Sequence, residues 1–78
     1  MVVSVLYLRI ELHGICSLKE KRSVISSLKD RAQNKFKLSI AEVGANDMWH
    51  LAEIGCSVVS NSHVFGEKVL QKVARFVD

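Results

Sequence analysis

Residues 2–25 read VVSVLYLRIELHGICSLKEKRSVI, and this stretch decides the fold because the spacing of its apolar residues changes partway along. As far as His13, apolar side chains recur at every second position, which predicts a strand over Val2–His13 with one buried face. That face would carry Leu6, Leu8, Ile10 and Leu12. Gly14 interrupts the alternation, and the pattern that follows has the period of a helix.

The start of this helix is marked by a capping box. Ser17 and Glu20 stand three residues apart, so that the hydroxyl and the carboxylate can each accept a hydrogen bond from a free amide of the first turn. We therefore predict a helix from Leu18 to about Lys37. At 100° per residue its inward stripe would hold Leu18, Val24, Ile25, Leu28, Ala32 and Phe36.

Two further strands are predicted after the helix. Leu38–Val43 is short and rich in β-branched residues, residues 44–47 read as a turn, and a second alternating run covers Trp49–Val59. The buried face of this longer run would hold Ala52, Ile54, Cys56 and Val58.

A second helix is predicted from Ser62, which serves as its N-cap, to the C-terminus. Its apolar side would hold Phe65, Val69, Leu70, Val73, Phe76 and Val77. The resulting order, β-α-β-β-α, predicts an α+β domain over residues 1–78. Two helices on one face of an antiparallel sheet would give the ferredoxin-like split arrangement without its usual fourth strand.

The composition is that of a small folded protein. Apolar residues make up 49% of the 78 residues and charged residues 24%, which excludes a disordered chain. No apolar run is long enough to span a membrane and no secretory signal is present, so we expect a cytoplasmic protein. Two cysteines are too few for a disulfide framework or a structural zinc site, and we expect no cofactor or metal.

Positive charge is concentrated in the first half of the chain. The net charge of +3 divides into +5 over residues 1–37 (eight Lys and Arg, three Asp and Glu) and −2 over residues 38–78 (three against five). Such an asymmetry is compatible with nucleic acid or another acidic partner, and equally with a basic surface that only aids solubility.

The S-L-K-E-K-R run places three cations where the helix dipole disfavours them. Lys19, Lys21 and Arg22, together with Lys29, are therefore predicted to contact an anion or the phosphates of RNA. The alternative is a solvated basic face, in which the Glu20 carboxylate interacts favourably with the positive end of the helix dipole and Lys21 extends its ammonium to solvent.

Other polar residues could in principle carry chemistry. Acid-base catalysis or a metal site could use the side chains of Glu42, Asp47, His50 and Glu53. The spacing of these residues favours structural roles instead. Trp49 is expected to bury one edge of the core.

His13 and Cys16 supply at most half of a metal site, and we expect neither a metal nor a redox role for them. Acylphosphatases bind phosphate at the loop before the first helix of a similar fold, yet the loop HGICSLKEKR lacks their glycine-rich signature.

The segments SLKEKRSVISSLKDR and SIAEVGANDMWHLAEIGCSVVSNS resemble the YlxP-like family of small bacterial domains of unknown function, over nearly the whole chain. The resemblance implies a ferredoxin-like fold, usually with a fourth strand after the second helix. Genes of that family lie beside those of a translation initiation factor and a ribosome-binding factor, which implies a role around translation or RNA.

Without a fourth strand, the usual order 4-1-3-2 makes the first strand an edge, and exposed edges pair with other chains. We therefore predict a homodimer or higher assembly, through this edge or through the outer face that bears Val3, Val5 and Tyr7.

Three functions are compatible with the sequence. The leading hypothesis is a non-enzymatic module accessory to translation or the ribosome that contacts RNA phosphate. The alternative is a protein-interaction or self-assembly domain, and the third is a small anion-binding hydrolase.

Overall fold

The computed structural model describes residues 1–77 and contains the five elements in the predicted order. These are β1 (Val2–Glu11), α1 (Leu18–Phe36), β2 (Ser39–Gly44), β3 (Leu51–Ser60) and α2 (His63–Val77). Each boundary lies within a few residues of its predicted position. No helix in the described residues is long and apolar enough to cross a membrane.

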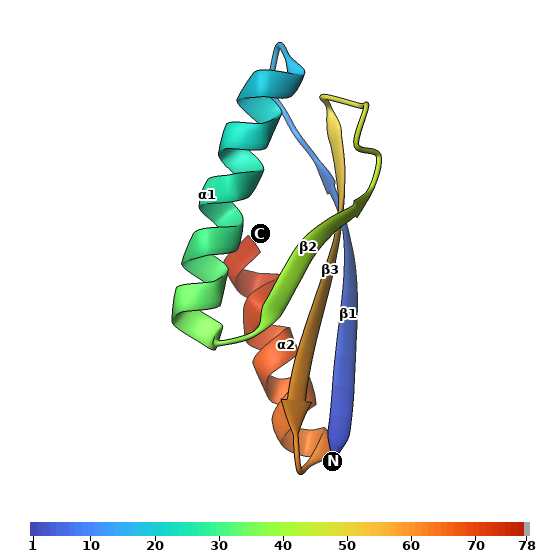
Figure 1. The fold of residues 1–78 in the computed structure, drawn as a ribbon, viewed down its shortest axis with the longest axis vertical. Helices are drawn as coiled ribbons and strands as arrows, with labels where there is room; N and C mark the ends of the chain where they lie inside the picture. The colour runs from blue at the N-terminus through green and yellow to red at the C-terminus, as the bar shows by residue number, and fades with distance from the viewer. Residues whose placement is uncertain (78) are drawn as a thin grey trace.

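The three strands form one antiparallel sheet in the order β1-β3-β2. Both helices lie on the same side of it, with α1 against β2 and α2 against β1 and β3 (Figure 1). This confirms the α+β split arrangement. It also confirms that β1 lies at an edge, since within residues 1–77 it pairs with β3 alone.

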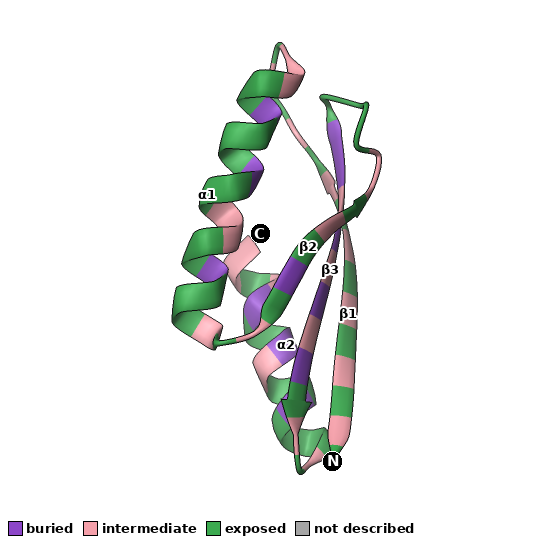
Figure 2. Cartoon of the chain, in the orientation of Figure 1, coloured by how far each residue is buried: buried purple, intermediate pink, exposed green. Residues whose placement is uncertain are grey.

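The core lies between the helices and the inner face of the sheet (Figure 2). Ala52 and Ile54 on β3 have no exposed surface, and neither have Ala32 on α1 and Val73 on α2. The whole predicted face of β3 is buried because helices cover the central strand. The buried cluster consists of Ile25, Ala32, Ile40, Ala52, Ile54, Cys56, Val58, Leu70 and Val73.

Three apolar side chains are more exposed than the sequence predicts. Val24 is 42% exposed because it lies at the margin of the α1 stripe, whose centre packs against β2 and α2. Phe65, 55% exposed, lies about a quarter turn from the centre of the buried stripe of α2. Trp49 is 46% exposed, so it does not bury an edge of the core; it follows the turn between β2 and β3 with its ring edge against His50.

The start of α1 has the predicted cap with one altered contact. The Ser17 Oγ accepts a hydrogen bond from the Glu20 amide at 3.2 Å, as in a capping box. The Glu20 carboxylate accepts from the Cys16 amide at 2.9 Å, one residue before the N-cap. At the other end Lys37 adopts a left-handed conformation, φ 53°, and donates its amide to the Gln33 carbonyl. The cap is therefore satisfied without any ligand.

Candidate functional site

Lys21 is the buried charged residue at the centre of the candidate region. Its side chain is on the inward stripe of α1, one turn before Ile25, and the residue is 1% exposed. The ammonium Nζ donates to the carbonyls of Ala45 and Met48, at 2.6 Å each. It also lies 2.7 Å from the Glu42 Oε2. We call these four residues the Lys21 latch, because they fasten the β2–β3 hairpin to the first turns of α1.

The contact between Lys21 and Glu42 is an ion pair rather than a well-aligned hydrogen bond. The Glu42 Oε2 is buried and accepts no hydrogen bond of acceptable geometry, although the two charged atoms are in contact. Charge attraction therefore holds this carboxylate, whose side chain is 18% exposed. In a partly buried site such an attraction is stronger than it would be in water.

The latch changes what the S-L-K-E-K-R run can do. An ammonium has three protons; two are donated to carbonyls here, and the Glu42 carboxylate lies in ion-pair contact with the same nitrogen inside a buried site. Lys21 therefore has no donor left for an external anion, which corrects its place in the predicted anion-contact set. It does not reach solvent either, because the hairpin covers it.

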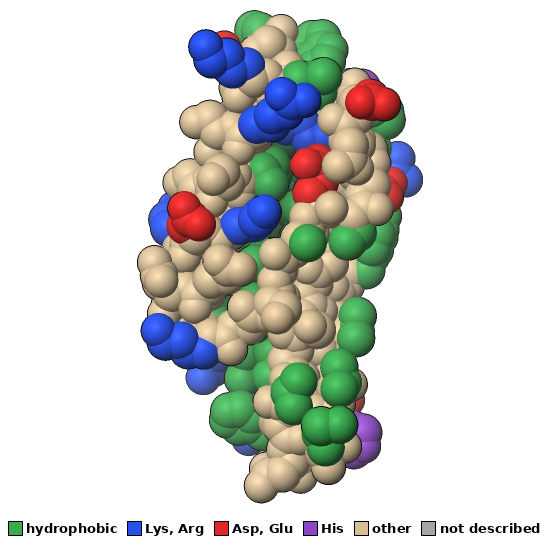
Figure 3. Space-filling view, viewed as in Figure 1, with side chains coloured by type: hydrophobic (Ala, Val, Ile, Leu, Met, Phe, Trp, Pro, Cys, Tyr) green, Lys and Arg blue, Asp and Glu red, His purple; other side chains and the backbone are tan. Residues whose placement is uncertain are grey.

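The other three predicted cations remain available on the surface. Lys19 and Arg22 are exposed and Lys29 is half-buried. The ion pair of the latch is the only one within residues 1–77, so none of the three is neutralised by a carboxylate. Figure 3 shows Lys and Arg side chains spaced along the α1 side of the molecule, with acidic groups near the hairpin.

A second surface is formed by the side of the sheet that no helix covers. Five large apolar side chains lie exposed on it, and we call this surface the open face. They are Val3 (55% exposed), Val5 (71%), Tyr7 (56%), Val43 (58%) and Val59 (66%). Val3 stands opposite Val59 in the β1–β3 register, so four of the five form one patch across neighbouring strands. All three residues predicted for self-association are therefore exposed on one surface.

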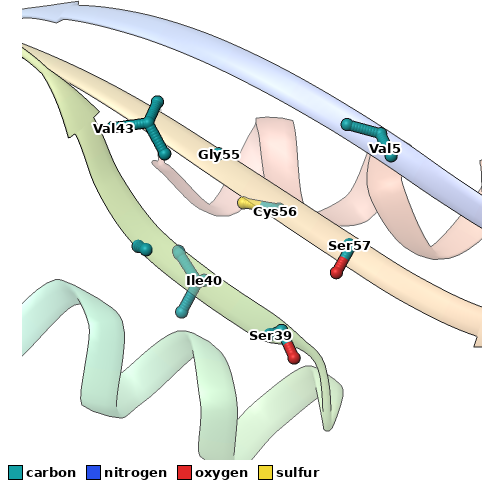
Figure 4. A pocket seen from close by; sticks show the side chains of 8 residues that line it. Val5, Ser39, Ile40, Val43, Gly55, Cys56 and Ser57 are labelled. Carbon is teal, nitrogen blue, oxygen red and sulfur yellow. The ribbon is translucent and has the colours of Figure 1, made fainter.

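Small residues on β3 leave a hollow in the open face. Val5 stands opposite Ser57 and Tyr7 opposite Gly55, so nothing large projects from the central strand between β1 and β2. A Cβ on Gly55 would lie 3.1 Å from Val43 Cγ1, which shows that Val43 leans over the glycine. The hollow has a volume of about 280 Å³, and Figure 4 shows Val43 and Val5 on its two sides.

The polar end of the open face lies at the other end of the strands. Arg9 stands opposite Glu53 in the β1–β3 register. The pKa of Tyr7 is raised, first by partial desolvation on the sheet and then by the charge and hydrogen bond of Glu53, with Arg9 opposing. The Tyr7 hydroxyl therefore ionises at higher pH than that of a free tyrosine.

One backbone hydrogen bond shows which residues of β1 face β3 and which face the free edge of the sheet. The Leu12 amide donates to the His50 carbonyl at 2.8 Å, so the even-numbered residues of β1 direct their backbone groups toward β3. The odd-numbered residues, which include Val5 and Tyr7, consequently direct theirs outward. A shallow groove of about 270 Å³ runs between this edge and α2, past Leu6 and Leu70.

The remaining candidate residues do not assemble into a site. Glu42 belongs to the latch, Asp47 and His50 are exposed on the hairpin, and Glu53 is half-buried on β3. Cys16 and His13 are both exposed. Within residues 1–77 no three His, Cys, Asp or Glu side chains are grouped so that they could hold a metal ion.

Sequence reasoning missed the latch, although a signal for it was present. Lys21 falls on the inward stripe of α1, and Glu42 shares the face of β2 that carries the buried Ile40. Opposite charges on two inward-facing positions indicate a buried pair. The partners Ala45 and Met48 act through backbone carbonyls, for which no residue type is diagnostic.

These observations define a three-stranded, ferredoxin-like split domain with a latched hairpin, a basic first helix and an uncovered apolar sheet face. The chain belongs to the family described as Protein of unknown function (DUF503), whose family model matches residues 3–78. It is similar to the "Uncharacterized protein YlxP" of Bacillus subtilis (strain 168), with 48% identity over 62 residues. That match covers 80% of this chain and 67% of the relative. The resemblance to a YlxP-like family is therefore confirmed.

Proposed function

We propose that this protein is a non-enzymatic interaction domain of the cytoplasm that associates with a second copy of itself through the open face. The observation that carries the proposal is the gathering of Val3, Val5, Tyr7, Val43 and Val59 on one surface, each more than half exposed. Isolated exposed apolar residues are ordinary, but a contiguous group of them marks an interaction surface.

The dimensions of the open face predict a weak dimer. β1 and β3 have 10 residues each. At about 3.3 Å per residue and 4.8 Å between strands, three strands give a flat footprint on the order of 450 Å². This is below the roughly 800 Å² per partner of a standard interface, so the dimer should dissociate at low concentration.

A second copy is the proposed occupant because the face carries both exposed apolar side chains and a hollow that could receive one. A two-fold axis presents the same patch to both partners, and the hollow beside Gly55 can receive an apolar side chain from the other copy. Arg9 and Glu53 then lie at the periphery, where charged residues remain solvated.

The test is sedimentation velocity across micromolar concentrations. We expect the unmodified protein to shift from monomer to dimer and Val5→Lys to remain monomeric, because a buried ammonium on each partner opposes the contact. Ser26→Lys is the matched control, since it adds the same charge at an exposed position of α1. A monomer at every concentration, or equal association of Val5→Lys, would refute the proposal. Circular dichroism establishes that each variant is folded.

A second candidate function is contact with RNA phosphate, in support of translation or the ribosome. Lys19, Arg22 and Lys29 support it, because they lie on one flank of α1 with no carboxylate paired to them within residues 1–77. With Lys21 withdrawn into the latch, this surface offers three cations. Contacts of this kind position RNA without reading its sequence.

Salt-dependent binding to a structured RNA tests this second candidate. We expect Lys19→Glu combined with Arg22→Glu to weaken binding and to flatten its dependence on salt. Lys29→Ala alone should have a smaller effect of the same kind. Binding that is indifferent to salt, or that survives the double reversal, would exclude this surface.

A further inference from the structure

A cluster of aromatic and basic side chains lies where the C-terminal ends of the two helices meet. The end of α2 lies against the C-terminal half of α1 (Figure 1). There the rings of Phe36 and Phe76 meet edge to face, with centroids 5.5 Å apart. Both side chains are only half-buried, so the pair forms an apolar floor that solvent can reach.

Four cations surround this aromatic floor. The Lys35 Nζ lies 5.1 Å from the Phe76 ring centroid and 5.6 Å from that of Phe36. The Arg31 Cζ lies 5.8 Å from the Phe76 centroid, from the same helix one turn earlier. Lys72 and Arg75 of α2 line the hollow with the two rings. The hollow has a volume of about 340 Å³ and is lined by these residues except Arg31, which lies beside it over the Phe76 ring. We call all six residues the helix-end cleft.

The charge of the cleft is not balanced by the protein. Within residues 1–77 the single ion pair is that of Lys21 and Glu42, so none of the four cations has a carboxylate partner. The helix dipole accounts for Lys35 and Arg75, which stand in the last turns of their helices. Its effect fades beyond the last turn, so it does not account for Lys72 in the hollow or for Arg31 beside it.

The combination of residue types indicates the class of ligand. Cations that converge on one hollow favour a ligand with several negative charges, and an aromatic floor favours a ligand with a flat ring. An acidic peptide satisfies the first requirement only. The volume is at the low end of small-ligand pockets, roughly 300–1,000 Å³, which suits one nucleotide unit and is too small for a duplex.

We propose that the helix-end cleft binds single-stranded nucleic acid, with phosphates on Arg31, Lys35, Lys72 and Arg75 and a base against Phe36 and Phe76. The site is separate from both surfaces described above. Counting 100° per residue, Arg31 and Lys35 fall on the opposite side of the inward stripe from Arg22 and Lys29. The proposal therefore stands or falls independently of the open face and of the Lys19 flank.

The test measures fluorescence anisotropy of a labelled uridine oligonucleotide with the full chain. Lys35→Glu combined with Lys72→Glu should weaken binding at least about tenfold, and should reduce the salt slope by about 0.7 for each lost phosphate contact. The matched control is Arg9→Glu combined with Lys68→Glu, which changes the net charge equally at two exposed positions outside the helix-end cleft and outside the Lys19 flank. We expect this control to stay within about twofold of the unmodified protein.

A crosslinking measurement locates the oligonucleotide on the protein. The oligonucleotide carries 4-thiouridine, and irradiation should crosslink it to the peptides that contain Phe36 or Phe76. Circular dichroism establishes that the variants are folded. The proposal is overturned by absent binding, by equal loss in both double variants, by crosslinks only elsewhere, or by competition from an acidic peptide as strong as that from the oligonucleotide.

Discussion

Replacement of Lys21 by methionine is expected to destabilise the fold severely. The substitution keeps most of the side-chain volume but removes two charge-assisted hydrogen bonds and leaves the Glu42 carboxylate without its counter-ion. Removal of one member of a buried ion pair costs about 3–5 kcal/mol. Because the Glu42 side chain is 18% exposed, water can solvate part of its charge, and we expect a loss of about 3 kcal/mol.

That loss is large against the stability of a domain of this size. At roughly 0.05–0.15 kcal/mol per residue, 78 residues give an unfolding free energy of about 4–12 kcal/mol. With a urea dependence of about 1 kcal/mol per molar, the midpoint should fall by about 3 M. Lys19→Met is the control, since Lys19 is exposed on the same turn, and its effect should stay within about 0.5 kcal/mol.

The sole tryptophan provides a local readout of the latch. Trp49 follows Met48, whose carbonyl binds Lys21, so its emission reports the hairpin, while circular dichroism reports the helices. In Lys21→Met we expect the tryptophan signal to change at lower urea than the helix signal. A double-mutant cycle with Glu42→Leu should recover at least about 1 kcal/mol, because the orphaned charge is then absent. A loss below about 1 kcal/mol, or no recovery in the double variant, would refute the latch.

Two further predictions follow from packing and burial. Gly66→Ala should lower the unfolding free energy by about 1–3 kcal/mol in thermal denaturation, although alanine has the better helix propensity, because the added Cβ would overlap the Ser4 hydroxyl of β1. The control is Gln71→Ala, at an exposed position of α2. A raised midpoint for Gly66→Ala would contradict the close packing. Burial raises the pKa of the Cys56 thiol above 9.0, so above about pH 9 the unfolded chain loses this proton first and the unfolding free energy falls as pH rises. Cys56→Ala should lack this part of the fall and Cys16→Ala, at an exposed thiol, should retain it; equal pH slopes in urea titrations of the two variants would count against the assignment.

The order and type of the elements could be read from the sequence because each depends on local patterns. The alternation that ends at Gly14, the capping box of Ser17 and Glu20, and the periodicity of both helices all act within a few residues. The ends of the strands are not set by local pattern alone, because they depend on pairing: β3 begins at Leu51, where it meets Glu11, rather than at Trp49.

The candidate surfaces were only partly predictable. The open face follows from the alternation of β1, so Val3, Val5 and Tyr7 were identified from sequence, but Val43 and Val59 join them only through the register of three strands. The helix-end cleft was not foreseen, because Phe36 and Phe76 are 40 positions apart and both read as ordinary core residues.

The sequence by itself determined the β-α-β-β-α order and the inner faces of the strands and helices, because periodicity and capping are local. Tertiary structure alone decided what the cations do. Lys21 and Lys19 stand two residues apart in the same basic run, yet one is enclosed by the hairpin and the other faces solvent. The physical reason is that a lysine's role depends on the acceptors brought to its ammonium. Here the Glu42 carboxylate and the carbonyls of Ala45 and Met48 come from a hairpin more than 20 residues away.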